Sequence, residues 1–268
     1  MTKALDSALL FAALRRFTAG LLLLLAAGMA APAAAQDDAP QAAKRIGVIS
    51  ILGDLLYDDR VGLTVFGNKL QRHDVSAWGL DDAWEGMIEA ALPGAIDAEI
   101  VPLTIDRALL RAAYPTAEDE DGWLAQYRTP KFKRITGALQ TIARDNRLDL
   151  IILLASDATD LAGTNQYLES FGAYRSGKRG PAWFYIVAQL HLIDGAAGEP
   201  TRSKWLETAT REKTQFARWP SQRVPDELLD RRFDEYADEE KAALAERFKA
   251  MPDTAFAPTL TKLFAPKK

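Results

Sequence analysis

The sequence contains no cysteine and only two histidines, His73 and His191. The absence of cysteine excludes disulfides, thiolate metal sites and cysteine nucleophiles. It also excludes a lipid-anchored bacterial lipoprotein, because the diacylglyceryl group of such a protein is attached to a cysteine. Both histidines fall in segments predicted to be strands, whereas catalytic groups favour loops at strand ends. An enzyme that depends on a serine–histidine pair or on metal-bound histidines is therefore disfavoured.

The chain also lacks a complete hydrolase motif. No Gly-x-Ser-x-Gly elbow occurs, and no Asp-x-x-His occurs near the C-terminus. Gly53-Asp54-Leu55 follows a predicted strand and resembles the Gly-Asp-Ser block of lipase-like esterases, but a leucine stands at the nucleophile position. We therefore predict no cofactor and no metal, and we favour a non-catalytic protein.

An excess of basic residues is absent too. The whole chain has 33 basic and 37 acidic residues. Without the three basic residues and one acidic residue of the first 35 positions, 30 basic and 36 acidic residues remain, a net charge of −6. Nucleic-acid binding requires a basic face, so we expect no nucleic-acid partner.

The first 35 residues have the pattern of an export signal. Lys3, Arg15 and Arg16 precede the apolar residues 21–27, and the alanines at 33–35 fit a small-x-small cleavage site. The run is shorter than the roughly 20 residues of a membrane-spanning helix. The alternative is an uncleaved anchor. We predict a cleaved export signal, a periplasmic protein, and no transmembrane segment after cleavage.

Apolar periodicity predicts an α/β fold for the remaining 233 residues. Residues 148–155 form a nearly continuous apolar run, typical of a strand that is buried on both faces. Further elements are predicted from alternation and helical spacing: strands at 45–52, 98–103, 182–193 and 201–210, a hairpin at 61–77, and helices at 81–92, 104–113, 130–146, 225–251 and 258–264.

These elements predict one domain with a mixed, mostly parallel sheet and packed helices, because strand–helix–strand passages favour parallel pairing. The hairpin is an addition near the N-terminus. The predicted boundaries are a signal peptide at 1–35, a disordered leader at 36–44, an α/β core at 45–212, and a helical extension at 213–268 that packs on the core.

The carboxyl edge of this sheet is the first candidate site. If strands 45–52 and 148–155 are parallel neighbours, polar residues after both strands meet where open α/β sheets bind ligands. The candidate ligand-binding residues are Asp54, Tyr57, Asp157, Asp160 and Asn165. Carboxylates there could hold Mg²⁺ or Ca²⁺, but aspartates after strands also cap turns, and this alternative stays open.

A predicted long loop at 156–181 is the second candidate site, since structureless loops of this length are usually functional or disordered. Its aromatic and basic side chains would suit a protein or an acidic polymer. The candidate partner-binding residues are Tyr167, Phe171, Tyr174, Arg175, Lys178 and Arg179. Alternatively, the aromatic residues pin the loop to the sheet.

The order of elements, together with Leu192-Ile193-Asp194 and Ala197-Gly198-Glu199 in the late hairpin, resembles the small α/β domain of bacterial envelope proteins. Examples are the N-terminal domain of the Tol-system propeller protein and the periplasmic part of the curli secretion channel. The resemblance covers about 45–210, and the hairpin at 61–77 and the loop at 156–181 depart from it. The whole chain also resembles exported proteobacterial proteins, a resemblance that implies no activity.

Together these features favour a non-catalytic periplasmic binding or adaptor protein of the cell envelope. An envelope protein or an acidic polymer is the expected partner. The alternative is a hydrolase that uses carboxylates, with or without a metal, at the carboxyl edge of the sheet.

Overall fold

The computed structural model describes residues 43–61, 69–114, 132–161, 167–177, 180–208, 216 and 218–266. The predicted signal peptide and nearly all of the predicted leader lie outside these ranges. Lys44, the last residue assigned to the leader, already belongs to the first strand. Among the described residues, the helices are all too short or too polar to span a bilayer.

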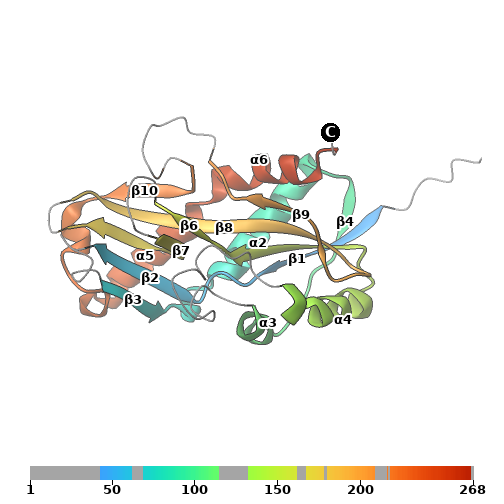
Figure 1. Cartoon of the computed structure of the whole chain (residues 1–268), viewed down its shortest axis with the longest axis horizontal. Helices are drawn as coiled ribbons and strands as arrows, with labels where there is room; N and C mark the ends of the chain where they lie inside the picture. The colour runs from blue at the N-terminus through green and yellow to red at the C-terminus, as the bar shows by residue number, and fades with distance from the viewer. Residues whose placement is uncertain are drawn as a thin grey trace, which may run out of the picture. The chain divides into compact units, whose positions relative to one another are not determined.

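One mixed sheet carries helices on both faces (Figure 1). The strands are β1 (Lys44–Ser50), β2 (Leu55–Val61), β3 (Lys69–Asp74), β4 (Ala98–Ile100), β5 (Leu150–Ser156), β6 (Ala158–Asp160), β7 (Tyr167–Ser176), β8 (Ala182–Asp194), β9 (Pro200–Trp205) and β10 (Ser221–Val224). The α-helices are α2 (Leu80–Ala91), α3 (Arg107–Ala113), α4 (Thr136–Asn146), α5 (Asp238–Ala250) and α6 (Asp253–Phe264). The α/β class is therefore confirmed.

The long strand β8 organises the sheet, whose main order is β3-β2-β7-β8-β5-β1-β4. The first half of β8 pairs with β7 and β10, and its second half pairs with β5 and β9. Strand β1 is parallel to β4 and β5, and β2 is parallel to β7. The other pairings among the described strands are antiparallel, so the expectation of a mostly parallel sheet was wrong. The long antiparallel β8 accounts for the difference, because several strands pair with it.

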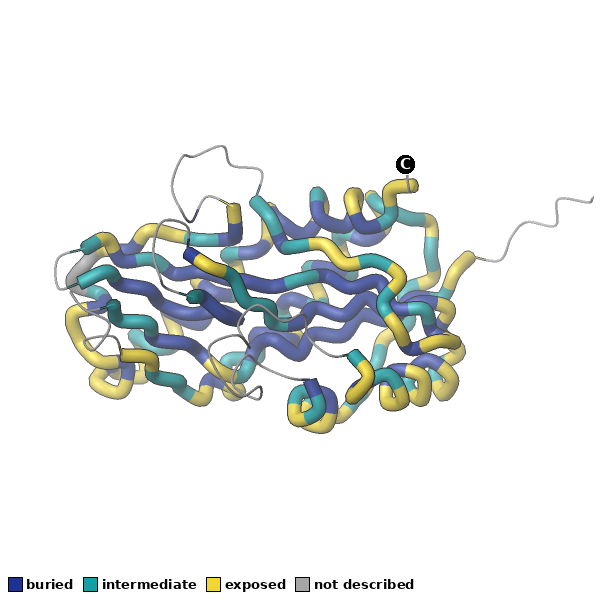
Figure 2. The backbone as a smooth tube through the Cα atoms, viewed as in Figure 1, coloured by how far each residue is buried: buried dark blue, intermediate teal, exposed yellow. Residues whose placement is uncertain are grey.

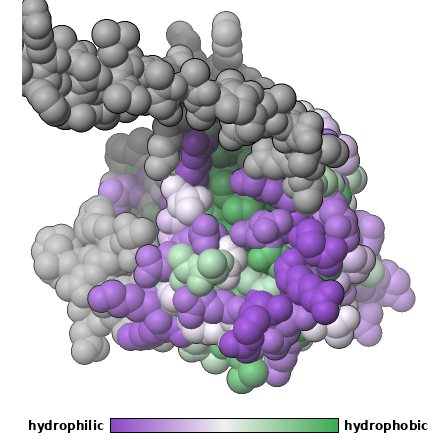
Figure 3. All heavy atoms as spheres, turned by 90° about the vertical axis from the view of Figure 1, so that its right-hand side faces the viewer, coloured by the Kyte–Doolittle hydropathy of each residue, from purple (hydrophilic) through white to green (hydrophobic). Residues whose placement is uncertain are grey.

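The central strands are buried on both faces, as the dark blue segments of Figure 2 show. Ile152 and Leu154 of β5 belong to a core with α2, α5 and α6, whereas Ile151 and Leu153 belong to a second core with α3 and α4. The prediction that 148–155 is a doubly buried strand is therefore confirmed. Charged and polar side chains dominate the described part of the face seen in Figure 3.

The C-terminal residues complete the first core. Phe248 of α5 and Phe256 and Leu260 of α6 are buried in it, and β10 adds a strand that the sequence did not predict. Regular α-helix begins at Asp238 rather than at 225, after two short 3-10 turns. These residues therefore supply part of both the sheet and its cover.

Two predictions of local structure were wrong. The hairpin is formed by β2 and β3, so its first strand begins at Leu55 rather than at 61, and β2 also pairs with β7. The predicted turn residues Gly67 and Asn68 lie outside the described residues. The predicted loop at 156–181 contains β6 and the ten-residue strand β7. Strand β7 was not predicted because it contains glycine and charged residues, which are typical of loops. The residues that pair with these charges are distant in sequence, as Asp230 is from Arg175.

Candidate functional site

A buried carboxylate organises the carboxyl end of β1. Asp81, in the first turn of α2, is 5% exposed. Its Oδ1 atom accepts hydrogen bonds from the Ser50 hydroxyl and from the backbone N–H groups of Leu52 and Gly53, at 3.0 Å and 2.9 Å for the two backbone donors. Such charge-assisted bonds fix the backbone as it leaves the strand.

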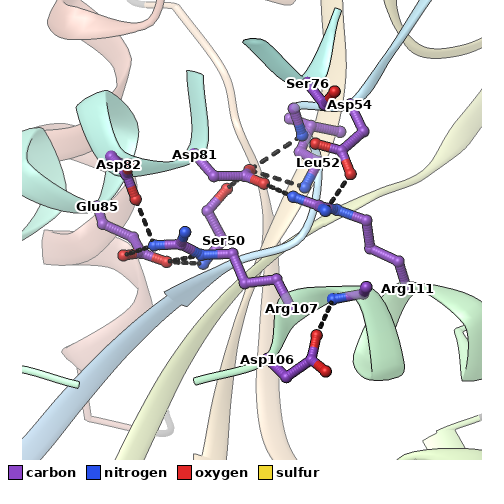
Figure 4. Close-up of polar contacts among 12 residues, drawn as sticks. Ser50, Leu52, Asp54, Ser76, Asp81, Asp82, Glu85, Asp106, Arg107 and Arg111 are labelled. Atoms are coloured by element: carbon purple, nitrogen blue, oxygen red, sulfur yellow. Dashed lines mark hydrogen bonds and ion pairs between the residues drawn. The ribbon is translucent and has the colours of Figure 1, made fainter. Parts of the chain in front are cut away.

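Two arginines of α3 hold that helix over the same edge (Figure 4). Arg111 bridges Asp81 and Asp54 through its two terminal nitrogens. Arg107 donates to Glu85 with 3.1 Å and 2.6 Å contacts and pairs with Asp82 at 2.6 Å. The positions of the two arginines, four residues apart, place both side chains on one face of the helix.

A cavity of about 400 Å³ opens beside the Asp54–Arg111 pair. This volume lies within the range of small-ligand sites. The cavity is lined by residues of the sheet, of α3 and of the segments that follow β1, β3 and α3: Ile51, Leu52, Asp54, Leu55, Tyr57, Asp74, Ser76, Arg111, Tyr114, Ser156 and Ser170. A second cavity, of about 280 Å³, shares Asp54, Ser76 and Arg111 with the first.

The carboxylates at this edge have shifted pKa values. Burial raises the pKa of Asp54, against the lowering effect of Arg111, and the nearby charges of Asp81 and Asp74 raise it further. Burial likewise raises the pKa of Glu85. The backbone hydrogen bond from Ser76 lowers the pKa of Asp74. The site therefore combines one partly buried and one exposed carboxylate with a guanidinium group.

The predicted ligand-binding residues are only partly brought together. Strands β1 and β5 are parallel neighbours, as expected, and Asp54 and Tyr57 line the cavity. Asp157 does not line it, because its side chain accepts hydrogen bonds from the Ala158 N–H group, at 2.7 Å, and from Gln189. Burial raises the pKa of Asp157 to about 6. Asp160 is exposed in β6, and Asn165 lies outside the described residues.

The predicted partner-binding residues do not form an exposed loop. Phe171 and Tyr174 of β7 are 0% and 1% exposed, and they pack in two different cores. Arg175 is buried and pairs with Asp230 at 2.5 Å, and Tyr167 is half-buried in the same strand. Lys178 and Arg179 lie outside the described residues. The aromatic side chains of this segment therefore contribute to the sheet and its cores.

Several residues of the cavity were not predicted, among them Arg111, Tyr114, Ser76 and Ser170. The pair Arg107 and Arg111 did carry a signal, because two cations four residues apart face acidic residues in the preceding helix. No sequence signal indicated that α3 lies over the end of the strand. That position depends on the packing of Leu110 and Tyr114 in the second core.

Neither histidine lines the cavity. The ring of His73 in β3 lies 4.5 Å from that of Phe233, between centroids. His191 in β8 is buried, its Nδ1 atom is 2.7 Å from the Ser203 hydroxyl, and burial lowers its pKa to about 3. Across the described ranges, groups of three or more histidine, aspartate or glutamate side chains arranged to hold a metal ion do not occur.

Comparison with known proteins identifies no family. No protein-family model and no curated protein matches the chain. Among solved structures, the chain is similar to PelC of Paraburkholderia phytofirmans, a dodecamer in its crystal, with 9% identity and a TM-score of 0.31. The match covers 84% of this chain and 90% of the PelC chain. At this identity and TM-score, it assigns no function to the present chain.

Proposed function

We propose that the protein is a non-catalytic binding or adaptor protein of the bacterial cell envelope, and that it binds its ligand or partner in the 400 Å³ cavity at the carboxyl end of β1 and β5. The observation that carries this proposal is the composition of the cavity wall. Aliphatic and aromatic side chains stand beside charged and hydroxyl groups in this wall, and small-ligand sites combine both kinds of group.

The charged groups of the wall are held by partners within the protein. Arg111 is held by Asp81, which the backbone of residues 52 and 53 holds in turn. A preformed site loses little conformational entropy on binding. The site therefore favours recognition of one chemical shape.

The backbone at the cavity is also unusual. Ser170, which lines the cavity, has a φ of 60°, in the left-handed region that residues other than glycine rarely adopt. Non-glycine residues held in this region cluster at functional sites. This observation supports a functional rather than a purely structural role for the cavity.

A binding role is favoured over hydrolysis because the cavity's reactive groups are already paired. Asp54 is engaged by Arg111, and both histidines lie elsewhere in the fold. The serine hydroxyls in the wall therefore have no imidazole beside them. The envelope location is part of the proposal and rests on the predicted export signal at 1–35.

The proposal is tested by titrating the isotope-labelled mature chain with small-molecule and protein fractions of its own periplasm. We expect backbone amide shifts confined to the cavity, around Leu52, Leu55, Ser156 and Ser170. Leu55→Trp, which fills the cavity mouth, should abolish these shifts. Leu109→Trp is the matched control, because Leu109 is 69% exposed on α3 and does not line the cavity. Shifts that survive in Leu55→Trp would refute the proposed site.

A further inference from the structure

The charges around the two adjoining cavities are unbalanced. Their linings contain the carboxylates Asp54, Asp74, Asp81, Asp82 and Asp106 and the guanidinium groups of Arg107 and Arg111. Five negative and two positive charges leave a net of three negative charges. A cavity lined by one sign of charge raises the local concentration of ligands of the opposite sign.

The two arginines are not available to an anionic ligand at low cost. Arg111 is bridged between Asp54 and Asp81, and Arg107 between Asp82 and Glu85. Asp81 is buried and fixed to the backbone. An anion that displaced one of these carboxylates would leave a partly buried negative charge without its partner, which is costly.

The uncompensated charge faces the larger cavity. Arg111 shares its one positive charge between Asp54 and Asp81, so the carboxylates of Asp54 and Asp74 on the cavity wall carry more negative charge than Arg111 offsets. Asp74 pairs with Leu55 in the hairpin, and the N–H group of Val75 donates to the carbonyl oxygen of Asp54 at 2.8 Å, so both carboxylates line the cavity from adjoining backbone. Their charges repel one another. A cation between them would relieve this repulsion.

A further cation near the site is already engaged. The guanidinium group of Arg72 lies 4.8 Å from the centroid of the Tyr57 ring, and its charge also acts on Asp59. Arg72 does not line the cavity. It therefore leaves the excess negative charge of Asp54 and Asp74 in place.

We infer that the larger cavity recognises a positively charged group, an ammonium or guanidinium, attached to an apolar body. The head would lie between Asp54 and Asp74, and the body would pack against Leu52, Leu55 and Tyr114. Both a free amine and a lysine or arginine side chain of a partner protein carry this chemistry. This inference rests on the proposed function and specifies the ligand class of the same site.

Three probes that share a phenyl ring and differ in their head group test the inference: phenethylamine, phenylacetate and phenethyl alcohol. Each is titrated into the isotope-labelled mature chain while backbone amide shifts are recorded. We expect phenethylamine to shift the amides around the cavity, and the other two probes to leave them unchanged.

Variants identify the groups that bind the head. Asp54→Asn with Asp74→Asn removes both charges and keeps the side-chain shapes, and asparagine can still cap Ser76 as Asp74 does at 2.9 Å. We expect about tenfold weaker amine binding, as for the loss of two partly exposed ion pairs. Asp145→Asn makes the same chemical change on the exposed end of α4 and should leave the affinity unchanged. A spectrum that superimposes on that of the unmodified chain shows that each variant is folded.

A blocked Gly-Lys-Gly peptide and its lysine-acetylated form distinguish the two sources. Tighter binding of the unacetylated peptide than of phenethylamine identifies a protein side chain, and the reverse identifies a free amine. The inference is overturned if phenylacetate or the alcohol binds as tightly as the amine, if the double variant binds the amine unchanged, or if neither ammonium probe shifts the cavity. Binding of phenylacetate would still support the proposed function, so the two failures are distinguishable.

Discussion

At the scale of single residues, a partly buried carboxylate couples the fold to pH. The Tyr185 hydroxyl donates to Asp59 Oδ2 at 2.6 Å, and burial raises the pKa of Asp59 to about 7. The folded state therefore holds a proton that the unfolded chain releases near pH 4. The stability contributed by this proton is complete below pH 4 and is lost as the pH rises through 7.

The first prediction follows from this loss of stability with rising pH. The melting temperature of Asp59→Asn should lie closest to that of the unmodified chain at pH 4 and exceed it by a growing margin up to pH 8, since asparagine still accepts the Tyr185 hydrogen bond and carries no charge. Thermal unfolding monitored by circular dichroism across this range measures the difference. Asp145→Asn, on the exposed end of α4, should show no such divergence. Parallel pH profiles for Asp59→Asn and the unmodified chain would contradict the raised pKa of Asp59.

A second residue-scale prediction concerns Gly172 in β7. A Cβ atom at this position would lie 2.0 Å from the carbonyl oxygen of Tyr57 in the neighbouring strand β2. Because that atom is backbone, Gly172→Ala should lower the free energy of unfolding by about 1–3 kcal/mol, as overpacking does. Denaturant unfolding measures the loss.

Gly86→Ala in α2 is the matched control. A Cβ atom there meets nothing within 4 Å, so this change should stabilise the protein by about 0.4–1 kcal/mol. If Gly172→Ala proved as harmless as Gly86→Ala, the close pairing of β2 with β7 would be refuted.

At the scale of elements, α3 owes its position to charge pairs as well as to packing. Seven residues form a helix that is marginal by itself, since isolated helices of this length are unstable. Arg107 and Arg111 join it to Glu85 and Asp81 of α2, and Arg111 also joins it to Asp54, between β1 and β2. Its apolar anchor in the second core is Leu110.

We therefore predict that Arg107→Gln with Arg111→Gln loosens α3 selectively. Hydrogen exchange of the amides in α3 should accelerate by about tenfold or more, because local opening no longer breaks the charge pairs. Within the described ranges, the ion pairs and hydrogen bonds of these arginines do not involve α4, so the amides of α4 should keep their protection. Equal acceleration in both helices would indicate general destabilisation instead.

The elements also show how far sequence patterns reach. Strands β5 and β8 were predictable because their apolar residues follow simple rules, and the helix α2 because its spacing and flanking Pro93-Gly94 define it. Strand β2 was missed because Asp58, Asp59 and Arg60 look like a loop. They are accommodated only after folding, through the Asp58–Arg60 ion pair at 3.0 Å and the hydrogen bond from Tyr185.

The candidate site was predictable only in part. Asp54 and Tyr57 follow a recognisable strand, so their place at the carboxyl edge followed from parallel pairing of β1 with β5. Arg111 and Ser170 come from segments whose position depends on tertiary packing. No local pattern encodes that packing.

At the scale of the whole molecule, the C-terminal helices are part of the core that closes the sheet. Trp84 of α2 is fully buried and donates to the carbonyl oxygen of Phe248 at 3.3 Å. Phe248 also contacts Phe171 and Phe184 of the sheet, with ring centroids 5.4 Å and 4.9 Å apart. The side chains of α5 and α6 therefore pack, together with α2, on the face of β7 and β8 that carries Phe171 and Phe184.

Deletion of residues 238–268 should consequently abolish cooperative unfolding and leave an aggregation-prone chain. Exposed apolar surface of this extent favours association. Deletion of 267–268 alone is the control and should leave the melting curve unchanged. Circular dichroism melts and sedimentation of the purified chains measure both effects. A folded, cooperatively melting product of the longer deletion would show that the α/β core is independent of α5 and α6.

The central claim is that the cavity beside Asp54 and Arg111 meets a ligand or partner in the cell envelope. The most direct test places a photo-reactive phenylalanine analogue at Leu55, which lines the cavity, or at Leu109, which does not. Each chain is expressed in its own cells and irradiated, and its periplasmic products are analysed by mass spectrometry. We expect one specific adduct from position 55 and none from position 109. The same adducts from both positions, or none from position 55, would contradict the proposed binding role of the cavity.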